Sequence, residues 1–261
     1  MLLADFHIHT TWSDGKLPMR TVVDLFGRSG HDVIAITDHV VNTDSMVGKV
    51  THRFGLTVTA DNFARYREEL EREKERAWNE YRMIVLAGFE LTQNAITRNS
   101  SAHVLALGVD EFISANGSVV EMLERAQRMS RIVVACHPTE QTDWYANTFY
   151  LWNRRKDVSD LVDLWEVACR WDLFPQVARA KLPYIGNSDF HREEHLYAWK
   201  TLLPCGRSER EVFNALEQGR GLAVTRLQNG AIHERTHLRT AHPPRHDRHF
   251  DAGVADLRVP A

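Results

Sequence analysis

The sequence predicts an α/β protein with a largely parallel sheet or barrel, and three observations support this prediction. Apolar runs of strand length recur along the chain and are separated by amphipathic segments, which is typical of βα units. Most of these runs are continuous rather than alternating, as in parallel strands that are buried on both faces. The length of 261 residues is normal for one α/β barrel, so we expect a single domain.

The predicted elements alternate along the chain in sequence order. The predicted strands are Leu2–His9, Val33–Thr37, Met83–Glu90, Ala102–Gly108, Ile132–Ala135, Leu161–Val167, Tyr184–Gly186 and a short eighth run, Leu222–Thr225. The predicted helices are the segment that Pro18 opens, Asn62–Arg82, Val119–Met129, Pro175–Lys181 and a segment that begins at Ser208 and ends at Gly219. Ser208 and Glu211 form a capping-box pattern, and Gly219 is a typical helix stop.

Three segments lack a periodic pattern. Val40–Ala60 and Gln141–Asp157 are predicted long loops, which in compact domains are often lids or binding loops. Residues 228–261 carry histidine, arginine and Pro243-Pro244, and we expect a flexible tail. The sequence therefore predicts a barrel domain over residues 1–227 and a tail over residues 228–261.

Composition excludes several classes of protein. The net charge of −3 gives no global basic field for bulk nucleic-acid binding. No apolar run approaches the ~18 residues of a membrane-spanning helix, and the first residues lack the basic start of a signal peptide. Three cysteines without CxxC spacing fit a reducing compartment. We expect a cytoplasmic protein with no membrane partner.

Six histidines and three carboxylates lie at or beside the ends of the predicted strands. His7 and His9 are two residues apart, so the period of a strand places both on one face. In an α/β barrel the carboxyl ends of the strands meet at one mouth, where the active site is built. We therefore expect the nine side chains to lie together. They are His7, His9, Asp14, His39, Glu90, His103, His137, Asp189 and His191.

These residue types point to a metal site. Imidazole and carboxylate groups are common ligands of divalent transition-metal ions. Nine ligands are too many for one ion and suit two or three, with Glu90 as the expected bridge. Clustered ions suit displacement at phosphorus, because they provide hydroxide at neutral pH and neutralise the attacking and leaving oxygens. The pattern predicts a metal-dependent hydrolase of phosphate esters.

Six motifs carry the nine residues. They are HxHTxxSDG over His7–Gly15, TDH over Thr37–His39, GxE over Gly88–Glu90, the strand residue His103, CHP over Cys136–Pro138 and SDxH over Ser188–His191. Their order along residues 2–225 resembles that of the polymerase and histidinol phosphatase (PHP) family of metal-dependent phosphoesterases. The resemblance implies a distorted (β/α)7 barrel with a trinuclear metal centre.

The resemblance also implies three ligand sets. His7, His9, Glu90 and Asp189 would hold one ion; Glu90, His103 and His137 a second; and Asp14, His39 and His191 a third. Some family members have histidine where this chain has Asp14. The extra carboxylate favours manganese, iron or magnesium over zinc at the third site. The expected catalytic residues are Glu90, Asp189 and His191.

Basic residues in the connections are candidate contacts for a substrate phosphate. Arg154 and Arg155 follow an aromatic run on which a base could stack. Arg53 lies in the long second connection, and Lys16 lies just past the Ser-Asp-Gly turn. The alternative interpretation of all four is an ordinary charge in contact with solvent.

Two aspartates are expected to support the site. Asp38 precedes a predicted ligand, and it either orients an imidazole or caps the following segment. Asp5 lies deeper in the first strand, where we expect a buried, structural hydrogen-bonding role.

We expect hydrolysis of a small phosphomonoester or nucleotide-type substrate by metal-activated hydroxide, because the chain is slightly acidic and shows no basic groove. The alternative is a phosphodiesterase or exonuclease acting on short single-stranded oligonucleotides or cyclic phosphates, bound by Trp144–Lys156. An amidohydrolase fits less well, since no metal-bridging lysine is evident. A non-catalytic polymerase-accessory module also fits less well, since every metal motif is intact. The sequence does not predict the oligomeric state.

Overall fold

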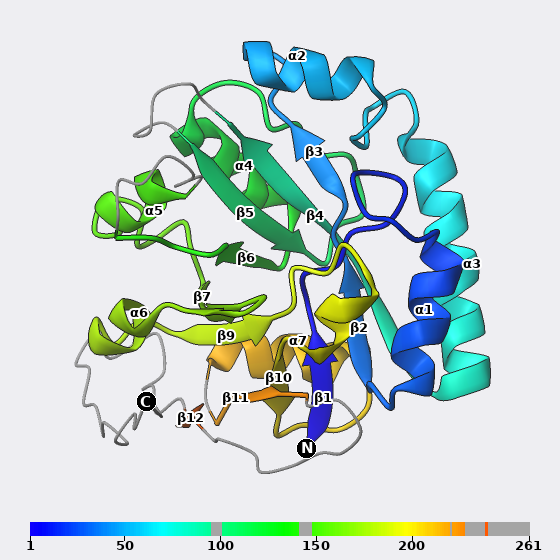
Figure 1. The fold of residues 1–261 in the computed structure, drawn as a ribbon. Helices are drawn as coiled ribbons and strands as arrows, with labels where there is room; N and C mark the ends of the chain where they lie inside the picture. Colours follow the sequence, from blue (N-terminus) through cyan, green and yellow to red (C-terminus); the bar gives the residue numbers. More distant parts are fainter. Residues whose placement is uncertain (95–100, 141–147, 220, 228–237, 240–261) are drawn as a thin grey trace.

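The computed structural model describes residues 1–94, 101–140, 148–219, 221–227 and 238–239, and strands and helices alternate along most of this chain (Figure 1). The strands are β1 (Leu2–Asp5), β2 (Val33–Ile36), β3 (His39–Val41), β4 (Ile84–Gln93), β5 (Ala102–Leu107), β6 (Ile132–Ala135), β7 (Leu164–Cys169), β8 (Asp172–Leu173), β9 (Tyr184–Asn187), β10 (Trp199–Leu203), β11 (Ala223–Arg226) and β12 (Leu238–Arg239). The helices are α1 (Met19–Arg28), α2 (Met46–Arg53), α3 (Phe63–Tyr81), α4 (Val119–Met129), α5 (Phe149–Asn153), α6 (Pro175–Arg179) and α7 (Glu209–Gln218), with a 3-10 turn over Glu193–Tyr197.

The described strands form one mixed sheet. Their order is β12-β11-β10-β1-β2-β4-β5-β6-β7-β8, with β3 beside β4 and β9 beside β7. β1, β2 and β4 are parallel neighbours, whereas β5 runs antiparallel to both β4 and β6. The prediction of a largely parallel sheet is wrong in this region. Residues 94–101 alone join β4 to β5, and a parallel connection needs a crossover of about a dozen residues or more.

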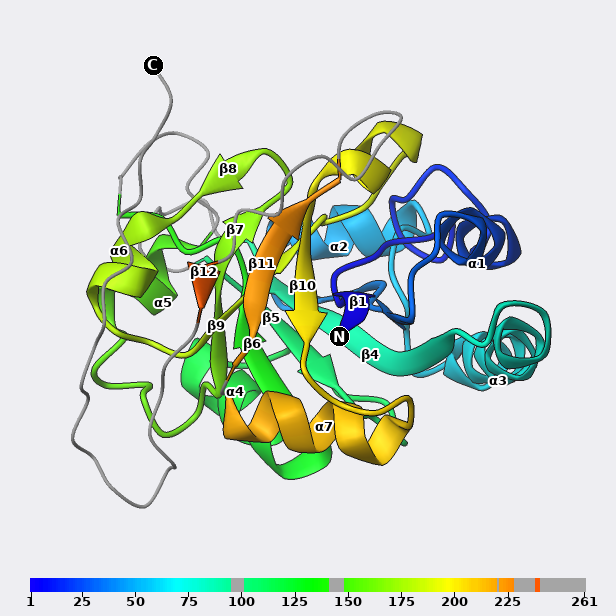
Figure 2. The same ribbon diagram turned by 90° about the horizontal axis from the view of Figure 1, so that it is seen from below.

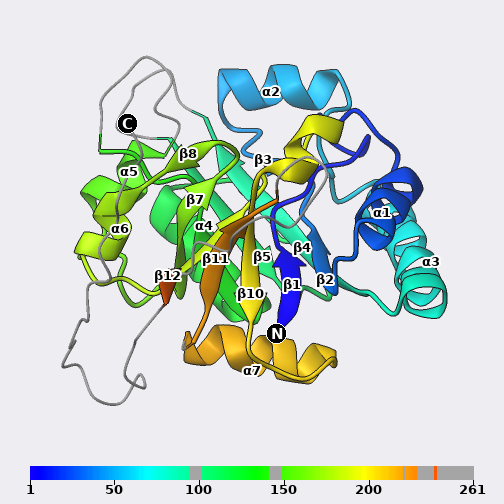
Figure 3. The ribbon, with the colours of Figure 1, turned by 60° about the horizontal axis from the view of Figure 1, so that its bottom comes forward.

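The sheet curls strongly into an open half-barrel (Figures 1 and 3). The segments that follow β1 and β9 lie side by side. The N–H of Phe190 donates to the carbonyl of His7 at 2.9 Å, and the N–H of His9 donates to the carbonyl of Phe190 at 2.8 Å. This pairing brings together two segments that are far apart in the sequence, and both carry predicted metal ligands.

Helices cover the outside of the sheet. α1 and α3 lie side by side on one flank, and α7 lies across the end of the sheet where β1 begins (Figures 1 and 2). Ser208 accepts the backbone N–H of Glu211, and Gly219 ends α7 in a left-handed conformation, which confirms the predicted bounds of this helix. No helix in the described ranges is both long enough and apolar enough to cross a membrane.

The apolar core occupies both faces of the sheet. In β2, Val33 belongs to a buried cluster with Phe213 of α7, while the next residue, Ile34, belongs to a second cluster with Phe26 of α1. Successive strand residues face opposite sides, so both faces of β2 are buried. This is why the predicted strands are continuous apolar runs.

Other segments also differ from the sequence prediction. The predicted loop Val40–Ala60 contains α2, and the predicted loop Gln141–Asp157 contains α5, while residues 141–147 lie outside the described part. β10 is not predicted because Lys200 interrupts its apolar pattern, yet this lysine is fully buried. Of the predicted tail, the structure describes only β12, which pairs with β11; the remainder lies outside the described residues.

Candidate metal centre

The nine predicted ligand side chains come together at one edge of the sheet. Most of them follow β1, β6 or β9 or lie near the end of β4, and the carboxyl ends of these strands meet there. His103 instead lies near the start of β5. Because β5 runs antiparallel to β4, its first residues lie where β4 ends, and His103 pairs in register with Thr92. The reversed strand thus places His103 beside the other ligands.

Glu90 lies at the centre of the cluster, and its two carboxylate oxygens face different histidines. Oε2 is 3.3 Å from Nε2 of His7 and 3.2 Å from Nε2 of His9. Oε1 is 2.8 Å from Nδ1 of His103 and 3.6 Å from Nε2 of His137. The side chain is 1% exposed. This placement suits a carboxylate that bridges two cations.

Asp189 lies against the first pair of histidines. Its Oδ1 is 3.5 Å from Nε2 of both His7 and His9, and its Oδ2 accepts a hydrogen bond of 2.6 Å from Nη2 of Arg170. Asp189 has a positive φ of 46°, a conformation that costs a non-glycine residue about 1–3 kcal/mol. Such strain persists where the surrounding contacts impose it, commonly at functional sites.

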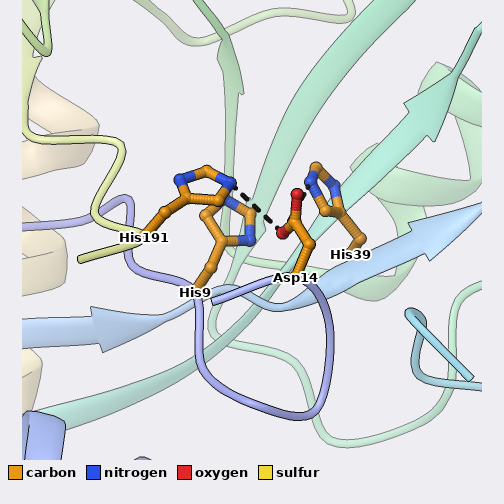
Figure 4. Close-up of side chains that lie close together, drawn as sticks. All are labelled: His9, Asp14, His39 and His191. Atoms are coloured by element: carbon orange, nitrogen blue, oxygen red, sulfur yellow. Dashed lines mark ion pairs between the residues drawn. The ribbon is translucent and has the colours of Figure 1, made fainter. Parts of the chain in front are cut away.

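A third group surrounds Asp14 (Figure 4). The Oδ1 of Asp14 is 3.2 Å from Nε2 of His191 and 3.5 Å from Nε2 of His39. The ring of His9 lies 4.3 Å from that of His191 and 4.4 Å from that of His39, between centroids. The structure thus adds His9 to the predicted set. Nδ1 of His39 is also 2.9 Å from Oε2 of Glu90, which joins this group to the other two.

The donor atoms fit divalent cations. Among the described residues, Nε2 of His7, Nε2 of His9 and Oδ1 of Asp14 are buried and make no well-aligned hydrogen bond, although each lies within 3.2–3.3 Å of a carboxylate or imidazole of the cluster. A bound cation would give each of these buried atoms a direct ligand bond. Mixed imidazole and carboxylate donors suit ions such as manganese, iron and zinc. We therefore regard this cluster as a candidate site for more than one divalent cation.

Asp38 and Asp5 support the cluster without facing its centre. Asp38 accepts hydrogen bonds from the backbone and hydroxyl of Thr10 and from the hydroxyl of Ser13, whose oxygen is 3.4 Å from Nδ1 of His9. It therefore acts on the imidazole through Ser13. Asp5 accepts the N–H of Ser188 at 3.1 Å, which confirms its predicted structural role.

Two residues of the site are not predicted from the sequence. Glu166 in β7 is fully buried, with its Oε1 2.9 Å from Nδ1 of His7. Arg170 follows β7 directly and contacts Asp189. The available signals were a carboxylate inside an apolar strand and a cation just past the end of a strand, at the edge where α/β sites are built.

Burial and neighbouring charges together determine the pKa values in the cluster, and burial prevails at His103, whose pKa is lowered. Burial alone would raise the pKa of Glu90, but the surrounding histidines, His39 foremost, hold it well below its ordinary value. Burial would lower the pKa of His39, yet Glu90 and Asp14 raise it to about 9. The pKa of His7 is likewise raised well above its ordinary value, since nearby carboxylates outweigh burial. In the metal-free state these histidines therefore hold protons at neutral pH.

Metal binding is expected to release protons and to strengthen as the pH rises. A cation must displace the protons of His39 and His7, whose raised pKa values leave both charged at neutral pH. Affinity should therefore fall as the pH drops below about 9. Calorimetric titration of Mn²⁺ in two buffers of different ionisation enthalpy measures the release. Equal heats in both buffers, with an affinity independent of pH, would contradict the expectation.

A cavity of about 980 Å³ adjoins the cluster. Several predicted ligands line it, and further lining residues come from β7 to α6, namely Leu173, Phe174, Gln176 and the basic side chains of Arg170 and Arg179. Sites for small molecules typically have volumes of roughly 300–1,000 Å³. The cavity therefore has room for an organic group beside the cluster.

The predicted substrate contacts on the first connections lie outside the described walls of this cavity. Arg53 ends α2 and is exposed. Lys16 is also exposed, but its backbone N–H donates to the carbonyl of His191 at 2.8 Å, so it lies next to a predicted ligand.

The predicted contacts that follow α5 also do not line the described cavity. Arg154 is exposed and pairs with Asp157 at 3.2 Å. The guanidinium of Arg155 lies 4.4 Å from the centre of the Trp152 ring. The arginines that line the cavity are instead Arg170 and Arg179.

The fold is similar to that of solved structures. The chain resembles a two-domain protein from Bacteroides vulgatus that contains a predicted PHP-like metal-dependent phosphoesterase, with a TM-score of 0.62 and 21% identity over 87% of this chain. This chain covers 65% of that protein's length. The fold therefore resembles that of a protein with a PHP-like domain, in agreement with the resemblance of the motifs.

Two other solved structures are less similar to this chain. One is to a candidate metal-dependent phosphoesterase from Bifidobacterium adolescentis, with a TM-score of 0.42 and 18% identity over 79% of this chain and 91% of the other. The other is to PsfC from Pseudomonas syringae, with a TM-score of 0.48 and 18% identity over 80% of this chain and 84% of the other. No protein-family model and no curated protein matches the chain.

Proposed function

We propose that the protein is a metal-dependent phosphoesterase that hydrolyses a small phosphomonoester or nucleotide-type substrate. The observation that carries the proposal is the position of Glu90, which directs one oxygen toward His7 and His9 and the other toward His103 and His137. A carboxylate so placed suits two adjacent cations, and paired cations are typical of phosphoryl chemistry.

The cluster offers three sets of ligands. His7, His9, Glu90 and Asp189 would hold one cation; Glu90, His103 and His137 a second; and Asp14, His39 and His191, with His9 beside them, a third. Bound divalent cations supply Lewis acidity toward phosphate oxygens and lower the pKa of water. The carboxylate of Asp14 favours manganese, iron or magnesium over zinc in the third set.

The chain's own residues orient the substrate. Arg170 has a side chain that is 39% exposed, and it lines the cavity while contacting Asp189. Its guanidinium can donate two parallel hydrogen bonds to a phosphate. We place the phosphate between Arg170 and the cluster, and the organic group of the substrate against Leu173 and Phe174.

Removal and replacement of metal tests the proposal. The chelated protein is supplied with Mn²⁺, Fe²⁺, Zn²⁺ or Mg²⁺ and assayed on p-nitrophenyl phosphate and bis(p-nitrophenyl) phosphate. We expect hydrolysis to return with metal, to be faster on the monoester, and to be absent in Glu90→Ala and Asp189→Ala. Faster hydrolysis of the diester would favour the phosphodiesterase alternative. Failure to bind any of the four ions would refute the metal centre.

Arg170→Ala is expected to raise KM for the monoester by about 10- to 100-fold with a smaller change in kcat, because a hydrogen bond to a charged group contributes about 1.5–3 kcal/mol. Steady-state kinetics at matched metal content measures the effect. Arg154→Ala is the control, since Arg154 pairs with Asp157 away from the described cavity. A rise in KM in the Arg154 variant alone would instead support the contact predicted from sequence.

A further inference from the structure

Glu166 is a fully buried carboxylate directly behind the candidate metal centre. Its Oε1 accepts hydrogen bonds from Nδ1 of His7 and from Nδ2 of Asn187, both at 2.9 Å. Its Oε2 accepts the backbone N–H of His137 at 2.7 Å. One side chain in β7 therefore links three parts of the chain: the segment after β1, the segment after β6, and β9. Two of these partners, His7 and His137, are predicted metal ligands.

The contact with His7 determines which imidazole nitrogen faces the cations. Asn187 and the His137 backbone are obligate donors, so both oxygens of Glu166 act as acceptors. With Glu166 ionised, Nδ1 of His7 carries the proton that faces Oε1, which leaves Nε2 as the nitrogen that can offer a lone pair to a cation. Nε2 is the atom that lies 3.3 Å from the Glu90 carboxylate. A carboxylate behind an imidazole also makes it a stronger ligand.

The contact with His137 holds a strained turn in place. His137 has a φ of 27°, a region that costs a non-glycine residue about 1–3 kcal/mol. A hydrogen bond from its N–H to a charged carboxylate contributes a similar amount, about 1.5–3 kcal/mol. The turn sets the imidazole so that its Nε2 lies 3.6 Å from Oε1 of Glu90, on the other side of the bridge from His7.

We propose that Glu166 is a positioning residue that aligns His7 and His137 for two different cations of the centre. The inference rests on the proposed metal centre and extends it to a carboxylate outside the three proposed ligand sets. Because one carboxylate serves a ligand on each side of Glu90, its loss should weaken both of the ligand sets that share Glu90.

Glu166→Gln tests this role because it preserves the shape of the side chain. An amide has one accepting oxygen, whereas Glu166 accepts through two. If that oxygen faces His7, the NH₂ group and the N–H of His137 are two donors facing each other, and the hydrogen bond is lost. If the oxygen faces His137, the NH₂ group donates to Nδ1 of His7, and the proton of His7 must move to Nε2. We expect zinc affinity to fall by about 10- to 100-fold, as for other outer partners of metal ligands.

Zinc affinity is measured by competition with a fluorescent chelator, in the full chain. Glu73→Gln is the matched control, because Glu73 is a buried glutamate on α3 that pairs with Arg76 far from the cluster in the fold. We expect the control to bind zinc like the native protein. Equal affinity of a folded Glu166→Gln protein and the native protein would overturn the inference and leave the metal centre intact.

A second measurement needs no variant. Nitrogen-15 NMR of the native, zinc-loaded protein reports which ring nitrogen of each histidine is protonated. We expect His7 to carry its proton on Nδ1, and a proton on Nε2 would overturn the inference even if the glutamine variant fails to fold. If the native protein binds no zinc, manganese, iron or magnesium, the proposed function itself fails, which is a different result.

Discussion

Replacing Glu90 with glutamine is expected to reduce metal-dependent hydrolysis by more than about 100-fold and to lower the number of cations bound. Loss of an outer partner of a metal ligand already costs about 10- to 100-fold, and Glu90 faces the histidines directly. The amide keeps the volume but offers one accepting oxygen where the carboxylate offers two. Its NH₂ group would face either the His7 and His9 pair or the His103 and His137 pair.

Metal content and kinetics of the purified variant measure this effect. Glu140→Gln is the control, because Glu140 lines the same cavity, is half exposed and pairs with Arg179 instead of the histidines. We expect the control to keep its metal. If Glu90→Gln binds the native number of cations and hydrolyses the monoester at the native rate, Glu90 is not a bridging ligand.

Replacing Lys200 with methionine is expected to destabilise the metal-free protein by about 3–5 kcal/mol, the usual cost of removing one partner of a buried ion pair. Nζ of Lys200 is 3.1 Å from Oδ2 of Asp5, and neither side chain is exposed. The lysine also donates to the carbonyls of Ala198 and Trp199. Methionine fills a similar volume but leaves the Asp5 carboxylate buried without its counter-charge.

Urea unfolding of the chelated proteins measures this loss. The double variant Lys200→Met with Asp5→Asn should recover much of it, because both charges are then absent while the amide oxygen can still accept the N–H of Ser188. Lys74→Met is the surface control: Lys74 pairs with the exposed Glu71, and such pairs contribute about 1 kcal/mol or less. A loss no larger than that of Lys74→Met would show that the buried pair is not stabilising.

The ligands could be predicted from the sequence because the end of a strand is a local feature of the amino-acid pattern. His7 and His9 share a face through the two-residue period of a strand, and Glu90 ends an apolar run. The role of Glu166 could not be predicted in this way, because the hydrogen-bond partners of a strand residue depend on which strands lie beside its own. Neither Asn187 nor His137 is near Glu166 in sequence, yet both donate to it.

The substrate contacts show the same limit. Arg154 and Arg155 are predicted contacts because they are basic residues near aromatic ones, but the structure lines the cavity with residues of β8 and α6 instead. That arrangement places Arg170 beside Asp189. A basic side chain in a connection can adopt many solvated positions, so composition alone does not determine which arginine lines the cavity.

The sequence by itself determined the α/β class, the positions of most strands and the nine residues that gather at one edge, because apolar periodicity and strand-end position are local properties. Only the tertiary structure decided the antiparallel direction of β5, the pairing of Lys200 with Asp5, and the contacts of Glu166 and Arg170. These depend on strand order and register, which arise from burial and hydrogen bonding between segments far apart in the chain.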